Sequence, residues 1–313
     1  MVQAALRAGQ AALLWGQAAL RARLVALPMG HVALHRRHTR GVSPAATLAD
    51  ALEPLRADPA HAVVLLDIDG TLAPIVRHAD DAQVPEATRT LLIEIAKRYG
   101  LVACVSGRRA VTARQIVAIG SIAYVGNHGG ELLRPAATQV EVDPELATWA
   151  ERVKEFAARA MTSERQRLRV RGEDKGAIFA LHWRGAPDED AAAEAVAEVA
   201  REAEREGFAA YWGRKVLEVR PPLGLDKGSG IAKLLSHDDG SGVSGMKAAV
   251  YVGDDSTDID AFHGLRALAQ SGELEHVICV AVSSEEAPAE LIEEADFEVD
   301  GQAGVRSLLE ALL

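Results

Sequence analysis

The chain has almost no cysteine. Cys104 and Cys279 are the only two in 313 residues, and each lies inside an apolar run, at 101–105 and at 277–282. This count and spacing match neither a disulfide framework nor a zinc site. The pattern favours two buried, reduced thiols that pack as small hydrophobic side chains. We therefore expect a protein of a reducing compartment, the cytoplasm.

Basic residues are also scarce relative to acidic ones. Lys and Arg number 34 against 45 Asp and Glu, which gives a formal net charge of −11. A general nucleic-acid binder needs basic surface to neutralise phosphates, so the composition argues against a nucleic-acid partner. A small anionic substrate is still compatible, because a local basic pocket can override the field of the whole protein.

The start of the chain lacks acidic residues and a spanning segment. Six arginines precede the first acidic residue, Asp50, and the apolar run 11–20 is followed by Arg21 and Arg23. A transmembrane helix needs about 20 apolar residues, so no transmembrane segment is expected. The run resembles a signal segment but has no convincing cleavage site. Three interpretations stay open: an amphipathic helix, an arm for a partner or membrane surface, and an over-long start with Met29 as the true first residue. We favour a dispensable extension.

The most informative stretch is DIDGT at 67–71, directly after the apolar run Ala62–Leu66. Such a run is typical of a buried parallel strand, and ligand sites of open α/β sheets lie at the carboxyl ends of these strands. Because strand side chains alternate faces, Asp67 and Asp69 point the same way. Two neighbouring carboxylates need a cation, a shared proton or strong hydrogen bonds to coexist. A hard divalent metal with oxygen ligands is the natural partner.

Strand and helix patterns alternate after Asp67, which is typical of a parallel α/β sheet. Helical spacing is found at 85–99, 229–235 and 308–313. Further strands are predicted at 101–105, 122–125, 248–252 and 277–282. The segment 240–245 reads as a surface loop, and no repeat of fixed period occurs.

Between about residues 136 and 221 the pattern changes. Helical runs at 145–160 and 191–206 alternate with pairs of strand candidates, at 168–170 and 177–183 and then at 209–212 and 215–219. Antiparallel hairpins with helices on one side form an α+β layer, which we interpret as a cap inserted into the core. We predict a catalytic core at 61–135 and 222–313, a cap at 136–221, and an extension over 1–60 whose structure the sequence does not assign.

Polar residues follow several of the predicted strands. Ser106 follows the second strand, Asp254 and Asp255 follow a later one, and Lys227 opens a predicted helix. The carboxyl ends of parallel strands share one edge, where a helix N-terminus favours an anion. Carboxylates, a hydroxyl, a lysine and an acidic metal ligand are the groups that phosphoryl transfer uses. A carboxylate nucleophile would split one hard step into two through an aspartyl-phosphate.

The order DIDGT, SGR (106–108), DKG (226–228) and GDD (253–255) resembles the four motifs of the haloacid-dehalogenase-type phosphatases. The resemblance implies a Rossmann-like parallel-sheet core, with Asp67 as nucleophile and Asp69 as general acid and base. It implies magnesium, Mg2+, as cofactor, held by Asp67, by Asp254 and by the backbone carbonyl of Asp69, with Asp258 as a supporting carboxylate. The resemblance also implies that Lys227 is one of the catalytic residues. The phosphate-binding residues that it implies are Asp67, Gly70, Thr71, Ser106, Gly107 and Lys227.

Within this superfamily the chain is similar to trehalose-6-phosphate phosphatases over roughly residues 61–313. The further stretches are DIDGTLAPI (67–75), GNHGGE (126–131), GEDKG (172–176), GRKVLEVRP (213–221) and GDDSTDIDAF (253–262), where Ile259 replaces the family's frequent Glu. The similarity implies hydrolysis of trehalose 6-phosphate in trehalose biosynthesis, with a functional link to a trehalose-phosphate synthase. The residues that it places at the sugar are Arg108, Asn127, His128, Glu131, Glu173, Lys175, Lys215 and Glu218.

Several alternatives stay open. Glu173 and Lys175 can share a face of a strand, but they could also form a surface ion pair that adds little stability. Lys215 and Glu218 face opposite ways in a regular strand unless a bulge intervenes, and His182 could serve packing or function. The substrate could be another sugar phosphate, such as sucrose 6-phosphate or a glucosyl- or mannosyl-phosphoglycerate. A non-catalytic sugar-phosphate-binding subunit is an alternative of another class, against which the complete motif set argues.

Overall fold

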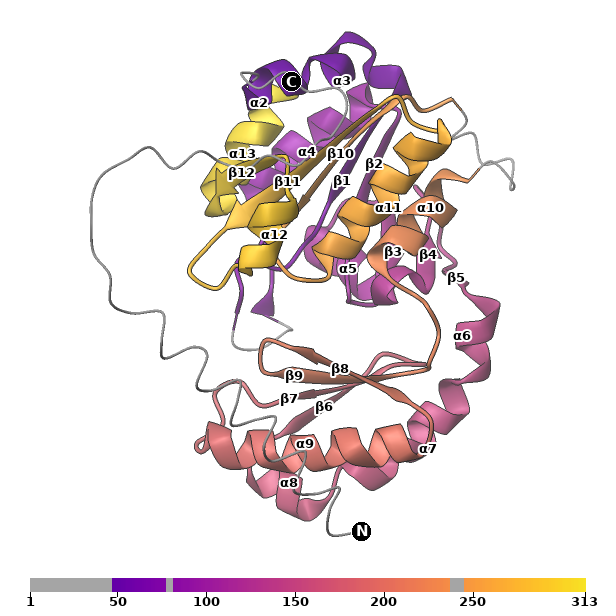
Figure 1. Cartoon of the computed structure of the whole chain (residues 1–313), viewed down its shortest axis with the longest axis vertical. Coiled ribbons are helices and arrows are strands. Elements are labelled where there is room, and N and C mark those ends of the chain that lie inside the picture. The colour runs from indigo at the N-terminus through magenta and orange to yellow at the C-terminus, as the bar shows by residue number, and fades with distance from the viewer. Residues whose placement is uncertain (1–46, 77–80, 237–244) are drawn as a thin grey trace, which may run out of the picture. The chain divides into compact units, whose positions relative to one another are not determined.

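The computed structural model describes residues 47–76, 81–236 and 245–313. The interpretations offered for the start of the chain, and most of the predicted loop at 240–245, lie outside these residues. The described strands form two sheets (Figure 1), one of eight strands in the order β12-β11-β10-β1-β2-β3-β4-β5 and one of four in the order β6-β7-β9-β8.

Six adjacent strands of the larger sheet run parallel: β12 (Phe297–Asp300), β11 (His276–Ser283), β10 (Ala248–Gly253), β1 (Ala62–Leu66), β2 (Leu101–Val105) and β3 (Ala123–Gly126). At one edge β4 (Glu131–Leu133) pairs antiparallel with β3, and β5 (Glu141–Val142) pairs antiparallel with β4. The predicted α/β class with a parallel sheet is confirmed, and its predicted strands are placed within two residues.

Helices cover both faces of this sheet. On one face pack α4 (Glu86–Arg98), α5 (Ala110–Val117) and α13 (Gly301–Ala311), with the short α2 (Leu48–Ala51), α3 (Glu53–Ala57) and η1 (Pro59–His61) nearby; the other face carries α10 (Lys227–Leu235), α11 (Asp258–Ser271) and α12 (Ala289–Glu294). Along β1, Val64 and Leu66 join the first apolar cluster, and Val63 and Leu65 join the second. A strand covered on both faces needs apolar residues throughout, which explains the uninterrupted run before Asp67.

The described part of the chain reaches slightly beyond the predicted core. Leu52 and Leu55 are fully buried in the first apolar cluster, although they belong to the stretch 1–60 that the sequence left unassigned. The last helix, α13, begins at Gly301 rather than at 308, because Val305 supplies an earlier apolar turn. No helix in the described ranges is both long and apolar enough to cross a membrane.

The smaller sheet is antiparallel throughout, with strands β6 (Arg171–Asp174), β7 (Phe179–His182), β9 (Val216–Arg220) and β8 (Ala209–Gly213). The helices of this region are α6 (Pro144–Thr148), α7 (Ala150–Ala160), α8 (Ser163–Arg167) and α9 (Glu189–Arg205). Residues of α7 and α9 share an apolar cluster with Leu181 and Leu217 of the sheet. We call residues 144–220 the cap layer. Its assignment as an inserted domain stays a prediction.

Two predicted boundaries in the cap layer were wrong. The strand expected at 168–170 is β6 at 171–174, because Arg169 adopts a left-handed backbone with φ of 61° and the extended pairing begins only after it. The helix expected at 145–160 is divided at Trp149, whose ring packs against Phe208 with centroids 5.6 Å apart. Both departures depend on local conformation or on distant contacts rather than on apolar spacing.

The helices α10 and α11 approach each other through glycine. A Cβ atom on Gly264 would lie 2.5 Å from Cα of Gly228, and one on Gly228 would lie 2.4 Å from the carbonyl oxygen of Asp260. Real side chains do not tolerate such distances, so both positions require glycine to keep this packing. The contact matters for the site, because α10 begins with Lys227 and α11 begins with Asp258.

We predict that Gly264→Ala lowers the free energy of unfolding by about 1–3 kcal/mol, because the new methyl group forces the two helices apart. Urea unfolding followed by circular dichroism measures this change. Gly120→Ala is the matched control: a Cβ there meets nothing within 4 Å, so the change should stay within about 0.5 kcal/mol. Equal effects of the two substitutions would contradict the packing argument.

Candidate active site

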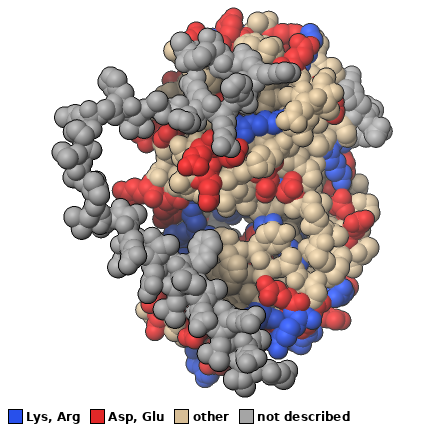
Figure 2. Space-filling view, in the orientation of Figure 1, with Lys and Arg blue, Asp and Glu red and all other residues tan. Residues whose placement is uncertain are grey.

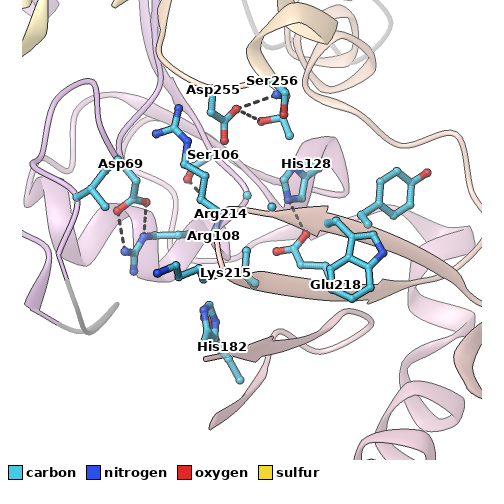
Figure 3. Close-up of a pocket in the computed structure, with 18 of the residues that line it drawn as sticks. Asp69, Ser106, Arg108, His128, His182, Arg214, Lys215, Glu218, Asp255 and Ser256 are labelled. Atoms are coloured by element: carbon cyan, nitrogen blue, oxygen red, sulfur yellow. Dashed lines mark hydrogen bonds and ion pairs between the residues drawn. The ribbon is translucent and has the colours of Figure 1, made fainter. Parts of the chain in front are cut away.

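A cavity of about 1020 Å3 lies between the carboxyl ends of the core strands and the cap layer (Figure 3). Its volume is in the upper part of the range for small-molecule sites. Figure 2 shows Lys and Arg side chains beside a hollow in the surface between the two sheets, despite the acidic composition. Of the residues predicted from the sequence, those that line the cavity are Asp67, Asp69, Ser106, Gly107, Arg108, His128, Glu173, Lys175, Lys215, Glu218, Lys227, Asp254 and Asp255.

Asp67 stands directly at the end of β1, where its backbone N–H donates to the carbonyl of Val252 at 2.9 Å. Its side chain is buried, and Oδ1 accepts from Nζ of Lys227 at 2.8 Å. Burial raises the pKa of Asp67 well above its ordinary value, against the opposing effect of Lys227, and Asp258 and Asp254 add to the rise. The carboxylate is therefore held in a place where negative charge is poorly compensated.

Lys227 is the first residue of α10 and is almost completely buried, with 2% of its surface exposed. The preceding Asp226 forms a capping box with Ser229, which fixes the start of the helix. Nζ of Lys227 donates to Oδ1 of Asp67 at 2.8 Å and to Oδ1 of Asp258 at 2.6 Å. Burial acts to lower the pKa of Lys227, but Asp258 and Asp67 outweigh it and raise the pKa well above its ordinary value. The ammonium stays charged.

Asp258 is a fully engaged carboxylate. Oδ1 accepts from Lys227 and from the hydroxyl of Tyr251 at 2.6 Å, and Oδ2 accepts from the backbone N–H groups of Asp254 and Asp255, each at 2.9 Å. All its favourable acceptor positions are thereby used. Gly253 makes room for it, because a Cβ there would lie 2.2 Å from Cγ of Asp258. This arrangement suits a residue that orients Lys227 and the β10–α11 loop.

Oxygen atoms of Asp67, Asp254 and Asp258 all lie within 4.8 Å of one another. Burial, with added repulsion from Asp258 and Asp255, raises the pKa of Asp254 to about 7. Thr71 donates to Asp254 at 3.3 Å, and Gly70 has to lack a side chain because its Cβ would lie 2.1 Å from Asp254 Oδ2. Clustered hard oxygen donors whose charge is only partly compensated fit a divalent cation. Since Asp258 is already engaged, Asp67 and Asp254 are the carboxylates suited to hold it.

Asp69 makes a bidentate ion pair with Arg108 (Figure 3). Nε and Nη2 of Arg108 donate to the two carboxylate oxygens at 2.6 and 2.7 Å. Fork-to-fork pairs of this kind are strong and directional. Ser106, at the end of β2, is buried, and its Oγ accepts from the backbone N–H of Arg108 at 3.2 Å. The sequence placed all three residues at the site but did not predict that Asp69 and Arg108 bind each other.

The cap side of the cavity is built around Glu218 on β9. Its Oε1 accepts from Nζ of Lys175 at 2.7 Å and its Oε2 from Nε of Arg220 at 2.8 Å. Lys175 also donates to the carbonyl of Gly107 at 3.0 Å, so it ties the cap layer to the core. Burial acts to raise the pKa of Glu218, but the charges of Lys175 and Arg220 hold it well below its ordinary value.

Lys175 therefore does not form the surface ion pair with Glu173 that the sequence left open. Both Lys175 and Glu218 are buried, with 5% and 7% exposed. Glu173 instead pairs with His182, whose Nε2–H donates to Oε2 of Glu173 at 2.8 Å. Both members of this second pair line the cavity.

His128 lies in a strained loop, η3 (Asn127–Gly129), after β3. Three consecutive residues there have positive φ, at 47° for Asn127, 53° for His128 and 98° for Gly129. Nε2 of His128 lies 2.7 Å from Nη2 of Arg220 and 3.0 Å from Oε2 of Glu218, so the ring nitrogen is in contact with both members of that ion pair. Burial lowers the pKa of His128, and Arg220 and Lys175 lower it further against the effect of Glu218. The imidazole is therefore neutral. Such strain is common at functional sites.

Several predicted site residues lie behind the cavity wall rather than on it. Nδ2 of Asn127 donates to Oε1 of Glu131 at 2.9 Å and to the carbonyl of Lys175 at 3.0 Å, and Oε2 of Glu131 accepts from the backbone N–H of Ala110 at 2.8 Å. Glu131 thus bonds the N-terminus of α5, where a negative charge is favourable. Thr71, with Gly70, acts in the same way by supporting Asp254. These residues position the wall.

Lys215 also departs from the predicted arrangement. It adopts a left-handed backbone with φ of 60° just before β9, and its ammonium forms an ion pair with Glu189 on α9. The irregular turn frees it from strict strand alternation, which explains why Lys215 and Glu218 can both line the cavity. Asp255 bonds both the backbone N–H and the hydroxyl of Thr257, at 2.8 and 2.7 Å, and does not contact Lys227.

Two arginines of the cap layer were missed by the sequence analysis. Arg214, in the turn between β8 and β9, donates to the carbonyl oxygen of Asp254 at 3.1 Å and to its Oδ2 at 3.4 Å. Arg220 holds Glu218 and His128, as described above. Arg220 could have been found, because it directly follows the predicted strand 215–219 and, two residues after Glu218, shares its face if the strand continues. Arg214 carried no such signal, since its contact depends on how the turn meets the core.

Comparisons with known proteins agree with this geometry. A model of the trehalose-phosphatase family matches residues 65–295. The chain is 35% identical over 207 residues to a trehalose-phosphate phosphatase of Mycobacterium avium, an alignment that covers 66% of this chain and 52% of the relative. It is 32% identical over 223 residues to trehalose 6-phosphate phosphatase RA3 of Zea mays, covering 66% of this chain and 60% of that protein. The chain thus spans little more than half the length of these curated relatives.

Solved structures show the same fold. The C-terminal domain of trehalose-6-phosphate phosphatase from C. albicans superposes with a TM-score of 0.68 at 20% identity, covering 87% of this chain and 98% of that one. A haloacid dehalogenase-like hydrolase from Bacteroides thetaiotaomicron gives a TM-score of 0.56 at 15% identity, covering 81% and 100%. At these identities the likeness concerns the fold, and it confirms the haloacid-dehalogenase-like architecture that the motifs predicted.

We predict that acid weakens the folded state through His128. Its ordinary pKa of 6.5 is lowered by burial, so below pH 6.5 the unfolded chain binds a proton that the folded protein excludes. This contribution is complete above about pH 6.5 and is lost as the pH falls, by at most about 1.4 kcal/mol per pH unit. His128→Asn removes the titration and keeps a residue that tolerates the left-handed backbone.

Urea unfolding of both proteins between pH 7.5 and 5.5 measures this effect. The stability of the wild type relative to His128→Asn should decrease steadily toward the acid end of the range. A difference between the two proteins that stays constant across the range would show that His128 is not held neutral.

Proposed function

The chain belongs to the trehalose-phosphatase family, and we propose that it hydrolyses trehalose 6-phosphate to trehalose and inorganic phosphate. The observation that carries this proposal is one cavity with two chemically different ends. The core supplies Asp67, Asp254 and Lys227, and the cap layer supplies Lys175 and Glu218. The first group suits a phosphoryl group and the second suits sugar hydroxyls. In the same proposal, residues 136–221 form a cap domain inserted into the core, which agrees with the separate sheet and apolar cluster of that region.

In the proposed reaction, a carboxylate oxygen of Asp67 attacks phosphorus, and the bond from phosphorus to the sugar oxygen breaks. Asp69 gives a proton to the leaving oxygen. Water then attacks the phosphorus of the aspartyl-phosphate, returns a proton to Asp69, and releases phosphate with free Asp67. Lys227 and Ser106 bind the phosphoryl oxygens. Because Arg108 binds Asp69 in this structure, Asp69 has to exchange that partner for the substrate before it acts as an acid.

We propose Mg2+ as the cofactor. The ion would be held by the side chains of Asp67 and Asp254 and by the backbone carbonyl of Asp69. The pKa values of Asp67 and Asp254 are raised, as expected for carboxylates whose charge a bound cation would compensate. When bound, the ion neutralises charge on the phosphoryl group and aligns it for displacement.

The sugar would lie against the cap layer. Lys175, Glu218, Glu173 and His182 present charged and polar groups to the cavity, and such groups can bond pairs of hydroxyls. Contacts from Lys175 to Gly107 and from Arg214 to Asp254 hold the cap layer against the core, an arrangement that would limit the access of bulk water once substrate fills the cavity. A trehalose-phosphate synthase would supply the substrate. The two buried free thiols, Cys104 and Cys279, agree with a cytoplasmic protein.

A panel of sugar phosphates with phosphate release as the readout tests this function, with and without Mg2+. We expect metal-dependent release from trehalose 6-phosphate to exceed that from sucrose 6-phosphate and from glucosyl- and mannosyl-phosphoglycerate. Asp67→Asn should abolish release without changing the circular dichroism spectrum. A preference for another member of the panel would identify that sugar phosphate as the substrate instead. No turnover of any phosphate ester would favour a non-catalytic subunit that binds sugar phosphate.

We predict that Lys175→Ala lowers kcat/KM for trehalose 6-phosphate by about 10-fold or more, since a hydrogen bond from a charged group to a sugar hydroxyl is worth about 1.5–3 kcal/mol. The loss on p-nitrophenyl phosphate, which has no sugar, should be far smaller. Lys154→Ala is the control. The ammonium of Lys154 is exposed on α7 and only loosely paired with Glu151, at 3.8 Å, so this substitution should leave both rates unchanged. Equal losses on the two substrates would remove the case for sugar recognition by Lys175.

A further inference from the structure

The cavity wall contains an exposed aromatic pair on the edge strand β8. Tyr211 and Trp212 are 44% and 52% exposed, the largest exposure of any aromatic side chain in the described parts of the chain. Both line the cavity. Most of the other cavity-lining residues from the cap layer are charged. These two rings are therefore the main flat apolar surface on that side of the cavity. Exposed aromatic groups that gather at a cavity indicate a binding role rather than a core role.

The orientation of Tyr211 is set by the charged groups beside it. Tyr211 lies directly opposite Glu218 in the register of β8 and β9, so the two side chains share a face of the sheet. The guanidinium carbon of Arg220 is 4.3 Å from the centroid of the Tyr211 ring. Arg220 is itself bound to Glu218 at 2.8 Å and to His128 at 2.7 Å. The ring therefore rests on a buried network and is held in place before any ligand binds.

Trp212 is placed differently. Successive strand residues point to opposite faces, and the Trp212 ring packs edge-on against Trp183, with centroids 6.0 Å apart and planes at 80°. Trp212 is still 52% exposed, but it pairs with Leu217 and so lies on the face of the sheet opposite to Glu218. Tyr211 is the one of the two that shares a face with Glu218.

The hairpin that carries Tyr211 also reaches the phosphate end of the cavity. Arg214, in the turn of this hairpin, donates to Asp254 at 3.1 Å. Tyr211 stands three residues before Arg214, which lies in the turn after β8, so the two backbones are at most about 10 Å apart. A phosphorylated disaccharide has its second ring at about such a distance from the phosphate. Hexose rings have apolar C–H faces and a rim of hydroxyls, so an aromatic face next to a carboxylate and a lysine matches both parts of the ring.

We propose that Tyr211 is a stacking platform for the sugar ring remote from the phosphate, and that it makes the site prefer a disaccharide phosphate to a monosaccharide phosphate. This proposal rests on the proposed function and names the residue that selects the second ring. Glu218 and Lys175 would bond the hydroxyls of a ring that lies on Tyr211. Glucose 6-phosphate carries the phosphate and one ring only, and does not reach the platform.

Steady-state kinetics of the full chain with Mg2+ test the proposal, with trehalose 6-phosphate and glucose 6-phosphate as substrates. Tyr211→Ala should raise KM for the disaccharide phosphate about five- to tenfold, the loss expected for one aromatic contact, with little change in kcat. The kcat/KM for glucose 6-phosphate should not change. Tyr211→Phe keeps the ring and should behave as the wild type. Tyr211→Leu keeps apolar cover over Arg220 without a flat face, so it should reproduce the loss even where Tyr211→Ala folds poorly.

The outcomes separate this proposal from the proposed function. A wild type that hydrolyses trehalose 6-phosphate while Tyr211→Ala and Tyr211→Leu keep the wild-type KM would overturn the platform alone. Equal losses on both sugar phosphates would also overturn it, because they would indicate a general effect on the site. A wild type that releases no phosphate from trehalose 6-phosphate would contradict the proposed function, and this proposal with it.

Discussion

A single buried ammonium group, that of Lys227, holds together the part of the molecule in which most charge is concentrated. It binds Asp67 from β1 and Asp258 from α11, and it begins α10 itself. Asp67, Asp254 and Asp258 bring three carboxylates within 4.8 Å of one another, and apart from Lys227 the described residues place only Arg214 against one of them, Asp254, at 3.4 Å. Removing one partner from such a buried cluster leaves uncompensated charge. The close glycine contact of α10 with α11 keeps the two partners at hydrogen-bonding distance.

A second buried network couples the cap layer to this centre. Glu218 binds Lys175 and Arg220, Lys175 reaches the carbonyl of Gly107, and Arg220 reaches His128. Gly107 directly follows Ser106, and its missing side chain leaves room for His128. The residues proposed for the sugar and those proposed for the phosphate are therefore bonded to the same core loops. A substitution at the sugar end of the cavity can therefore shift residues at the phosphate end through these hydrogen-bonded side chains.

Much of the core could be predicted from the sequence, because its strands are short apolar runs followed at once by polar motif residues. Asp67, Ser106 and Asp254 each end a strand, and a parallel sheet has to bring such ends together. The pairing of Asp69 with Arg108 and of Arg214 with Asp254 could not be predicted, since it depends on loop and turn conformations that apolar spacing does not report. Glu131 is a second example. Its motif suggested a contact with the sugar, but its carboxylate accepts from the backbone N–H of Ala110 at the start of α5.

In the proposed reaction Asp67, held by Lys227, forms a covalent bond to phosphorus. Rapid acid quenching of the wild type during turnover of trehalose 6-phosphate, followed by borohydride reduction and peptide mass spectrometry, tests it directly. An acyl phosphate at Asp67 is reduced to homoserine, whereas a free carboxylate is not. We expect homoserine at position 67 alone. Phosphate release with an unmodified Asp67, or with the modification at another carboxylate, would contradict it.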